Sequence, residues 1–286
     1  MRKMKWYKEV FLKCSDFFST HLIRNKLSYQ EELECRSKEK NRIVPTIMMH
    51  GTNGTRRSLG SMIKRLTKAK KAKKVMDIEV SKTGDITIDG ELDYYNNGPA
   101  PLIQIIFKES NPTEWQQGMW LNDVLTKLQV EYGVVEVDFV GHSMGGITGL
   151  RYIVDHAHDF SAIQIRKLVC IGSPFNSEVV HESGITKYDC DENGPNHFHE
   201  TYRYLKSYSE RLPNSLRILN IYGDLKNGSK SDGVVSTSSA RALKHIIEGK
   251  VNYYIEREVR GWRAQHSLLH ENRQVDDLVA YFLWRK

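Results

Sequence analysis

The sequence predicts an α/β protein with a doubly wound, mostly parallel sheet. Three observations support this class: apolar runs alternate with helical patterns, a glycine-rich turn follows an early strand, and a second such turn joins a later strand to a helix. Right-handed helical crossovers between parallel strands place ligands at the carboxyl ends of the strands. The 286 residues, 40% of them hydrophobic, suffice for one such domain.

The expected elements fill most of the chain after residue 42. In chain order, apolar runs predict strands over 43–49, 75–80, 86–90, 102–107, 134–140, 167–172, 216–222 and 251–259, of which 75–80 and 86–90 form a hairpin-like excursion. Apolar residues at helical spacing predict helices over 115–132, 198–212 and 275–284, and further helices follow the two glycine-rich turns.

The most informative stretch is Gly-His-Ser-Met-Gly at residues 141–145. It lies between an apolar run and a helical pattern, and a Gly-x-Ser-x-Gly turn in that place is typical of a nucleophile elbow. Glycines flank the serine because the strand and the helix converge there. We therefore expect Ser143 to be the nucleophile at the apex of this turn.

An oxyanion loop is predicted upstream of the elbow. The expected strand 43–49 ends in His-Gly-Thr-Asn-Gly at residues 50–54, and a buried strand followed by His-Gly-x-x-Gly is typical of such a loop. Its backbone amides would stabilise the negative oxygen that forms when a serine attacks a carbonyl. We assign the two donors to the amides of Thr52 and Met144, with Asn53 as the alternative to Thr52.

An acid and a base follow in the chain order that this machinery requires. Asp232, in Ser-Asp-Gly-Val-Val, is favoured as the acid over Asp224, which directly follows a strand and could cap a turn. His266 lies between the last strand and the final helix and is favoured as the base. His270 is its competitor, but it stands beside Glu271 and could pair on that helix.

These segments resemble the α/β-hydrolase superfamily. More closely, the chain is similar to an uncharacterised hydrolase family of Gram-positive bacteria whose members are labelled candidate cell-surface hydrolases. Six stretches carry the resemblance, at 50–54, 111–120, 141–146, 172–176, 231–235 and 266–272. The resemblance covers about residues 43–286. It implies the α/β-hydrolase fold and a serine hydrolase apparatus, and it implies no particular substrate.

The start of the chain differs from that family. Many members begin with an apolar anchor or export signal, whereas no stretch here reaches the 7–15 consecutive apolar residues of a signal peptide or the roughly 20 of a membrane span. A cytoplasmic location is therefore expected. Residues 1–41 form a basic amphipathic segment and linker, which we expect either to pack on the hydrolase body or to contact an anionic membrane surface.

Composition and charge narrow the possible partners. The net charge is +7, and the densest basic run, 68–74, lies at the expected end of the helix after the oxyanion loop, where lysines complement the helix dipole. The run has neither aromatics nor a reader fold, so nucleic acid is not an expected partner. Four cysteines without paired spacing fit a reducing compartment.

Residues 42–286 are expected to form the hydrolase domain, with a cap insertion at about 176–213 that lines the acyl or alcohol site. Metal-ligand residue types occur in this insertion without a recognised spacing, so no metal or cofactor is expected. These residues are His181, Asp189, Cys190, Asp191, His197, His199 and Glu200.

The expected function is serine hydrolysis of a small-molecule or acyl carboxylic ester, with Ser143, His266 and Asp232 as the triad. Three alternatives stay open: a lipase at a membrane surface, an acyltransferase, and a non-catalytic binding protein with this fold.

Overall fold

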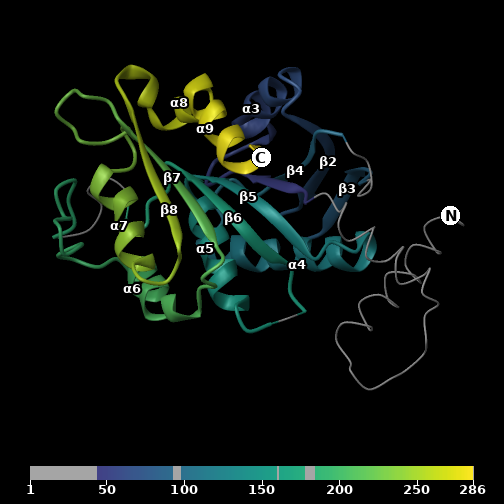
Figure 1. Ribbon diagram of the computed structural model, residues 1–286, viewed down its shortest axis with the longest axis horizontal. Helices are drawn as coiled ribbons and strands as arrows, with labels where there is room; N and C mark the ends of the chain where they lie inside the picture. Colours follow the sequence, from purple (N-terminus) through teal and green to yellow (C-terminus); the bar gives the residue numbers. More distant parts are fainter. Residues whose placement is uncertain (1–43, 93–97, 160, 178–183, 286) are drawn as a thin grey trace, which may run out of the picture.

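The computed structural model describes residues 44–92, 98–159, 161–177 and 184–285 (Figure 1). A single sheet of eight strands crosses the described part of the chain. In sequence order the strands are β1 (Thr46–Met49), β2 (Ala72–Val80), β3 (Ile86–Gly90), β4 (Ala100–Phe107), β5 (Glu136–His142), β6 (Gln164–Ile171), β7 (Arg217–Asp224) and β8 (Tyr253–Arg260).

Helices and single turns connect the strands. They are α3 (Arg56–Lys68), α4 (Glu114–Tyr132), α5 (Met144–His156), α6 (Glu200–Ser207), η1 (Ser209–Arg211), α7 (Thr237–Ile247), η2 (Trp262–Ala264), α8 (His266–Leu269) and α9 (Arg273–Trp284). The spatial order of the sheet is β3-β2-β4-β1-β5-β6-β7-β8. Every neighbouring pair is parallel except β2 with β3, which confirms the predicted doubly wound, mostly parallel class.

Successive residues of the central strands point to opposite faces of the sheet, and each face carries its own core. Ile47 and Met49 of β1 belong to the cluster with α4, α5, α6 and α7, whereas Met48 belongs to the cluster with α3 and α9. Phe139 and Val140 of β5 divide in the same way. Strands with both faces buried read as continuous apolar runs, which is why the sequence located them.

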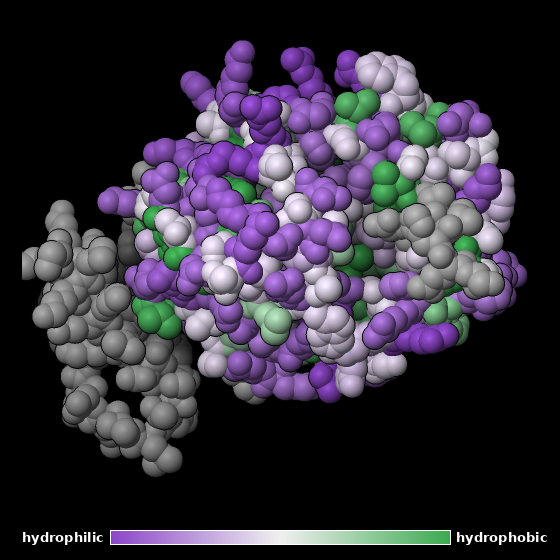
Figure 2. All heavy atoms as spheres, turned by 180° about the vertical axis from the view of Figure 1, so that it is seen from behind, coloured by the Kyte–Doolittle hydropathy of each residue, from purple (hydrophilic) through white to green (hydrophobic). Residues whose placement is uncertain are grey.

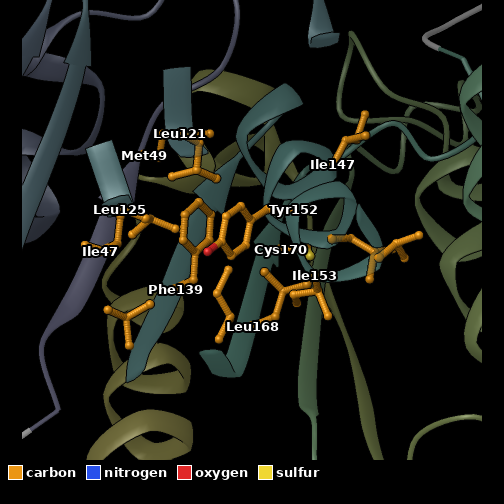
Figure 3. Close-up of a cluster of buried hydrophobic side chains, with 14 of the residues drawn as sticks. Ile47, Met49, Leu121, Leu125, Phe139, Ile147, Tyr152, Ile153, Leu168 and Cys170 are labelled. Carbon is orange, nitrogen blue, oxygen red and sulfur yellow. The ribbon is translucent and has the colours of Figure 1, made fainter. Parts of the chain in front are cut away.

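The close packing of α5 against β5 fixes the position of the turn between them. Figure 3 shows the Phe139 ring beside Tyr152, with Leu121 and Leu125 around it. A side chain at Gly149 of α5 would come within 2.8 Å of the Phe139 ring. Because interiors are packed as densely as organic crystals, this contact leaves the helix little freedom to shift.

Three expectations about the elements need correction. The segment expected as an excursion is a full member of the sheet, since β2 pairs in parallel with β4 as well as antiparallel with β3. The lysine run does not end a helix, because α3 ends at Lys68 and Lys73 and Lys74 belong to β2. The helix expected over 198–212 is α6 followed by the separate turn η1.

The N-terminal segment, residues 1–41, lies outside the described residues, so its membrane contact and the cytoplasmic location stay predictions. No described helix is long and apolar enough to cross a membrane. Figure 2 shows one face of the molecule, where hydrophilic residues dominate and hydrophobic residues occur in small separate patches.

Candidate active site

Ser143 occupies a sharp turn between β5 and α5, as the motif predicts. Its backbone has φ 55° and ψ −128°, a conformation that side-chain-bearing residues rarely adopt. The Ser143 amide donates to the carbonyl of Ile171 at 2.8 Å, which ties the turn to the end of β6. A side chain at Gly141 would collide with the backbone of Gly145, so the strand and helix can converge only because both positions are glycine.

The structure brings Asp232 and His266 into direct contact. His266 Nδ1 lies 2.8 Å from Asp232 Oδ2, and both side chains are buried. A carboxylate has no proton to donate, so Nδ1 carries the proton and Nε2 of the neutral ring is left as a proton acceptor. The other oxygen, Oδ1, accepts from the amides of Val234 at 2.9 Å and Val235 at 2.7 Å. The carboxylate therefore holds the imidazole in the tautomer that a general base requires.

Ser143 and His266 end at the same edge of the sheet. The residue before the serine, His142, places its ring 4.7 Å from the His266 ring, centroid to centroid. A side chain at Gly172, at the end of β6, would lie 3.2 Å from His266 Nδ1 and 3.3 Å from Asp232 Oδ2. In the described part of the chain no hydrogen bond joins the Ser143 hydroxyl to the imidazole, a looseness common between nucleophile and base before substrate binds.

The two competing residues make other contacts. Asp224 accepts from the amide of Lys226 at 2.8 Å and from its Nζ at 2.7 Å, so it shapes a turn at the end of β7. His270 places its Nδ1 3.4 Å from Glu271 Oε1, as the sequence suggested. Burial lowers the pKa of His270 below the ordinary histidine value. Neither residue replaces Asp232 or His266 in the pair.

The oxyanion loop is built around the ring of His50. His50 Nδ1 donates to the carbonyl of Gly51 at 2.8 Å, and Nε2 accepts from the amide of Phe107 at 3.1 Å. Burial lowers the pKa of His50, and a neutral ring satisfies both bonds. A side chain at Gly54 would collide with this ring, which explains the second glycine of His-Gly-x-x-Gly.

The loop faces the elbow, where the two predicted donors meet. A side chain at Gly51 would lie 2.8 Å from the Met144 nitrogen. Thr52 Oγ1 contacts Met144 Sδ at 3.5 Å. The Asn53 amide donates to the carbonyl of Ser110 at 2.5 Å and is therefore occupied. The amides of Thr52 and Met144 have no hydrogen-bond partner among the described residues, which favours the pair chosen from sequence over the alternative with Asn53.

Met144 is supported from behind by two residues that sequence reasoning missed. Thr148 Oγ1 lies 3.0 Å from the Met144 carbonyl and 3.2 Å from Gln117 Oε1 of α4. Gln117 is fully buried, and its Nε2 has no partner among the described residues. Exchanging the oxygen and nitrogen of this amide lets Gln117 donate to Thr148, which then donates to Met144. Thr148 stands one helical turn after Met144, so its spacing was a usable signal, whereas the Gln117 contact depends on tertiary packing.

The segment between β6 and β7 is anchored by a buried carboxylate. Asp189 accepts from His197 Nδ1 at 3.1 Å and from Asn176 Nδ2 at 3.4 Å, and Asn176 also donates to the carbonyl of His197. The described residues contain no group of three or more His, Cys, Asp or Glu side chains that could hold a metal ion; His181 lies outside them. The role of this segment as a cap stays a prediction.

Comparison with known proteins gives consistent results. The lin2722 gene product of Listeria innocua has a structure with 28% sequence identity and a TM-score of 0.77, covering 85% of this chain and 95% of its own. A candidate cell surface hydrolase of Lactobacillus plantarum WCFS1 has 25% identity and a TM-score of 0.69, covering 85% of this chain and 92% of its own.

A monoacylglycerol lipase of Paleococcus ferrophilus shares the fold, with 14% identity, a TM-score of 0.51 and coverage of 85% of this chain and 96% of its own. No curated protein sequence gives a significant match. Residues 34–286 match a family described as alpha/beta hydrolase of unknown function (DUF915). The chain therefore belongs to this alpha/beta hydrolase family, in agreement with the resemblance found in the sequence.

Proposed function

We propose that the protein is a serine hydrolase that cleaves carboxylic esters through an acyl-enzyme intermediate. The observation that carries the proposal is the bond between His266 Nδ1 and Asp232 Oδ2, which leaves Nε2 as the acceptor at the sheet edge where Ser143 is held in a strained turn. A serine hydroxyl is a weak nucleophile until an adjacent base removes its proton.

In the first step, Ser143 Oγ attacks the ester carbonyl while His266 Nε2 takes the hydroxyl proton. The developing imidazolium is stabilised by the Asp232 carboxylate. Negative charge on the carbonyl oxygen is met by the amides of Thr52 and Met144, and one such donor is worth about 3 kcal/mol in the transition state. Because these amides have no other partner in the described structure, they need no rearrangement to serve.

The tetrahedral intermediate collapses when His266 donates its proton to the leaving alcohol, and the acyl group stays on Ser143. Water then enters, gives its proton to His266 and attacks the acyl carbon. The second intermediate releases the carboxylic acid as the proton returns to Ser143, which restores the enzyme. The bonds broken and formed balance without a cofactor.

The test is hydrolysis of p-nitrophenyl esters over a series of acyl lengths. Ser143→Ala should lower turnover at least about 10³-fold while the urea unfolding midpoint stays unchanged. Ser173→Ala is the matched control, because Ser173 is a buried serine just after β6 whose hydroxyl has no partner among the described residues. It should keep its turnover. Retention of most activity in Ser143→Ala would refute the assignment.

Labelling with a fluorophosphonate separates catalysis from mere binding. Ser143 Oγ would bond to phosphorus, fluoride would leave, and His266 would take the hydroxyl proton. We expect mass spectrometry to find the label on Ser143 alone. A folded protein that neither labels nor turns over any ester would be a binding protein with this fold.

A further inference from the structure

Three histidine rings are stacked in sequence beneath the candidate site. The His142 ring lies between the other two, 4.7 Å from the His266 ring at an interplanar angle of 45° and 4.7 Å from the His270 ring at 88°. All three side chains are buried. The motif Gly-x-Ser-x-Gly leaves the residue at position 142 open, so the elbow itself does not require a histidine there.

His142 makes one directed bond, and it is to the residue that carries the candidate base. Its Nε2 lies 3.1 Å from the main-chain oxygen of His266. A carbonyl oxygen can only accept, so Nε2 carries the proton and donates. Burial lowers the pKa of His142 well below the ordinary histidine value, and the neighbouring His266 and His270 lower it further. His142 is therefore neutral, with its single N–H committed to this carbonyl.

We propose that His142 is a positioning residue that fixes His266 relative to Ser143, an inference that rests on the proposed function. His266 is held at three other atoms only by Asp232, through its amide at 2.9 Å and its Nδ1 at 2.8 Å, and by the helical turn that follows. Asp232 lies on the acid loop and has no covalent link to the elbow. His142 adjoins Ser143 directly, so its bond sets the spacing between nucleophile and base.

The other end of the same turn is held separately. Arg65 of α3 donates to the main-chain oxygen of His270 at 2.8 Å and pairs with Glu271 and Asp276. The α8 turn is thus fixed at its first residue by His142 and just past its last residue by Arg65. The two anchors come from different segments, so the contribution of His142 can be removed without disturbing the other.

Three variants at position 142 separate hydrogen bonding from space filling. His142→Gln keeps an N–H donor at the distance of Nε2 from the backbone. His142→Leu keeps apolar bulk and lacks the donor, and His142→Asn keeps polarity but places its amide too close to the backbone to reach His266. His245→Leu is the matched control, because His245 is a buried histidine of α7 with a pKa also lowered by burial.

The first measurement is the second-order rate of fluorophosphonate labelling, together with kcat and KM for p-nitrophenyl esters. We expect His142→Leu and His142→Asn to lower the labelling rate and kcat at least 10-fold, with KM within about 3-fold of wild type. His142→Gln should stay within about 3-fold in every parameter, and so should His245→Leu. If His142→Leu does not fold, His142→Asn supplies the comparison.

The second measurement does not depend on turnover. Proton–nitrogen NMR of the imidazoles reports the Nδ1 proton of His266 in its bond to Asp232. This signal should persist in wild type and His142→Gln and broaden through solvent exchange in His142→Leu and His142→Asn. Unchanged signals and labelling rates in the folded Leu and Asn variants would overturn the inference. Failure of wild type to label would instead overturn the proposed function, and the NMR comparison would still decide the role of His142.

Discussion

The substitution Asp232→Asn tests the site at one atom. Asp232 Oδ1 accepts from the amides of Val234 and Val235, so an asparagine must place its oxygen there, because an NH₂ group cannot face two N–H donors. The NH₂ group then faces His266 Nδ1, which must give up its proton to accept it. The proton moves to Nε2, and the ring can no longer receive the serine proton.

The magnitude follows from this forced change of tautomer. A triad held in the wrong tautomer loses about 10⁴-fold in kcat, equal to about 5 kcal/mol of transition-state stabilisation. The free energy of unfolding should change by only about 1–2 kcal/mol, because charge-assisted hydrogen bonds become neutral ones and none is left unpaired. Function and stability should therefore separate clearly in this variant.

The assay measures kcat and KM for p-nitrophenyl esters beside urea unfolding of each variant. Asp224→Asn is the matched control, since Asp224 also follows β7 but accepts only from Lys226. It should leave kcat unchanged. Activity of Asp232→Asn within 10-fold of wild type, in a protein that unfolds normally, would refute the argument from tautomers.

Three further predictions concern the surroundings of the site. Gly54→Ala should destabilise the fold by about 1–3 kcal/mol in urea unfolding, because the added methyl group collides with the His50 ring; an unchanged midpoint would contradict the packing. Thr148→Val should lower kcat and cost about 1–3 kcal/mol of stability by leaving Gln117 and the Met144 carbonyl unpaired, and Thr148→Ser should restore both. Burial lowers the pKa of His50 and His142, so the unfolded chain binds more protons below its histidine pKa of about 6.5, and the unfolding free energy should fall as pH drops from about 6.5, by up to about 1.4 kcal/mol per pH unit for each histidine. Stability that is flat from pH 7.5 to 5 would contradict the buried, neutral state of these rings.

The parts of the site that the sequence could predict are local ones. The turns at 50–54 and 141–145 each lie within a few residues, and their glycines follow from close approach of the backbone. The contact of His142 with His266 spans 124 residues, and no spacing rule connects them. Helix α7 was missed although Ser236 caps it and buried residues recur along it. Strand β2 was taken for an excursion because its polar outer residues hide its place beside β4.

The ion pair between Arg65 and Asp276 spans 211 residues and joins the first described helix, α3, to the last, α9. Proteins are made from the amino end, so the ribosome completes the elbow and the oxyanion loop long before it reaches His266 and Asp276. During that interval Arg65 has no carboxylate at position 276 to meet, and the turn that carries the candidate base does not yet exist. The nascent chain therefore holds its serine without the base, and reactivity would begin only when α9 docks against α3.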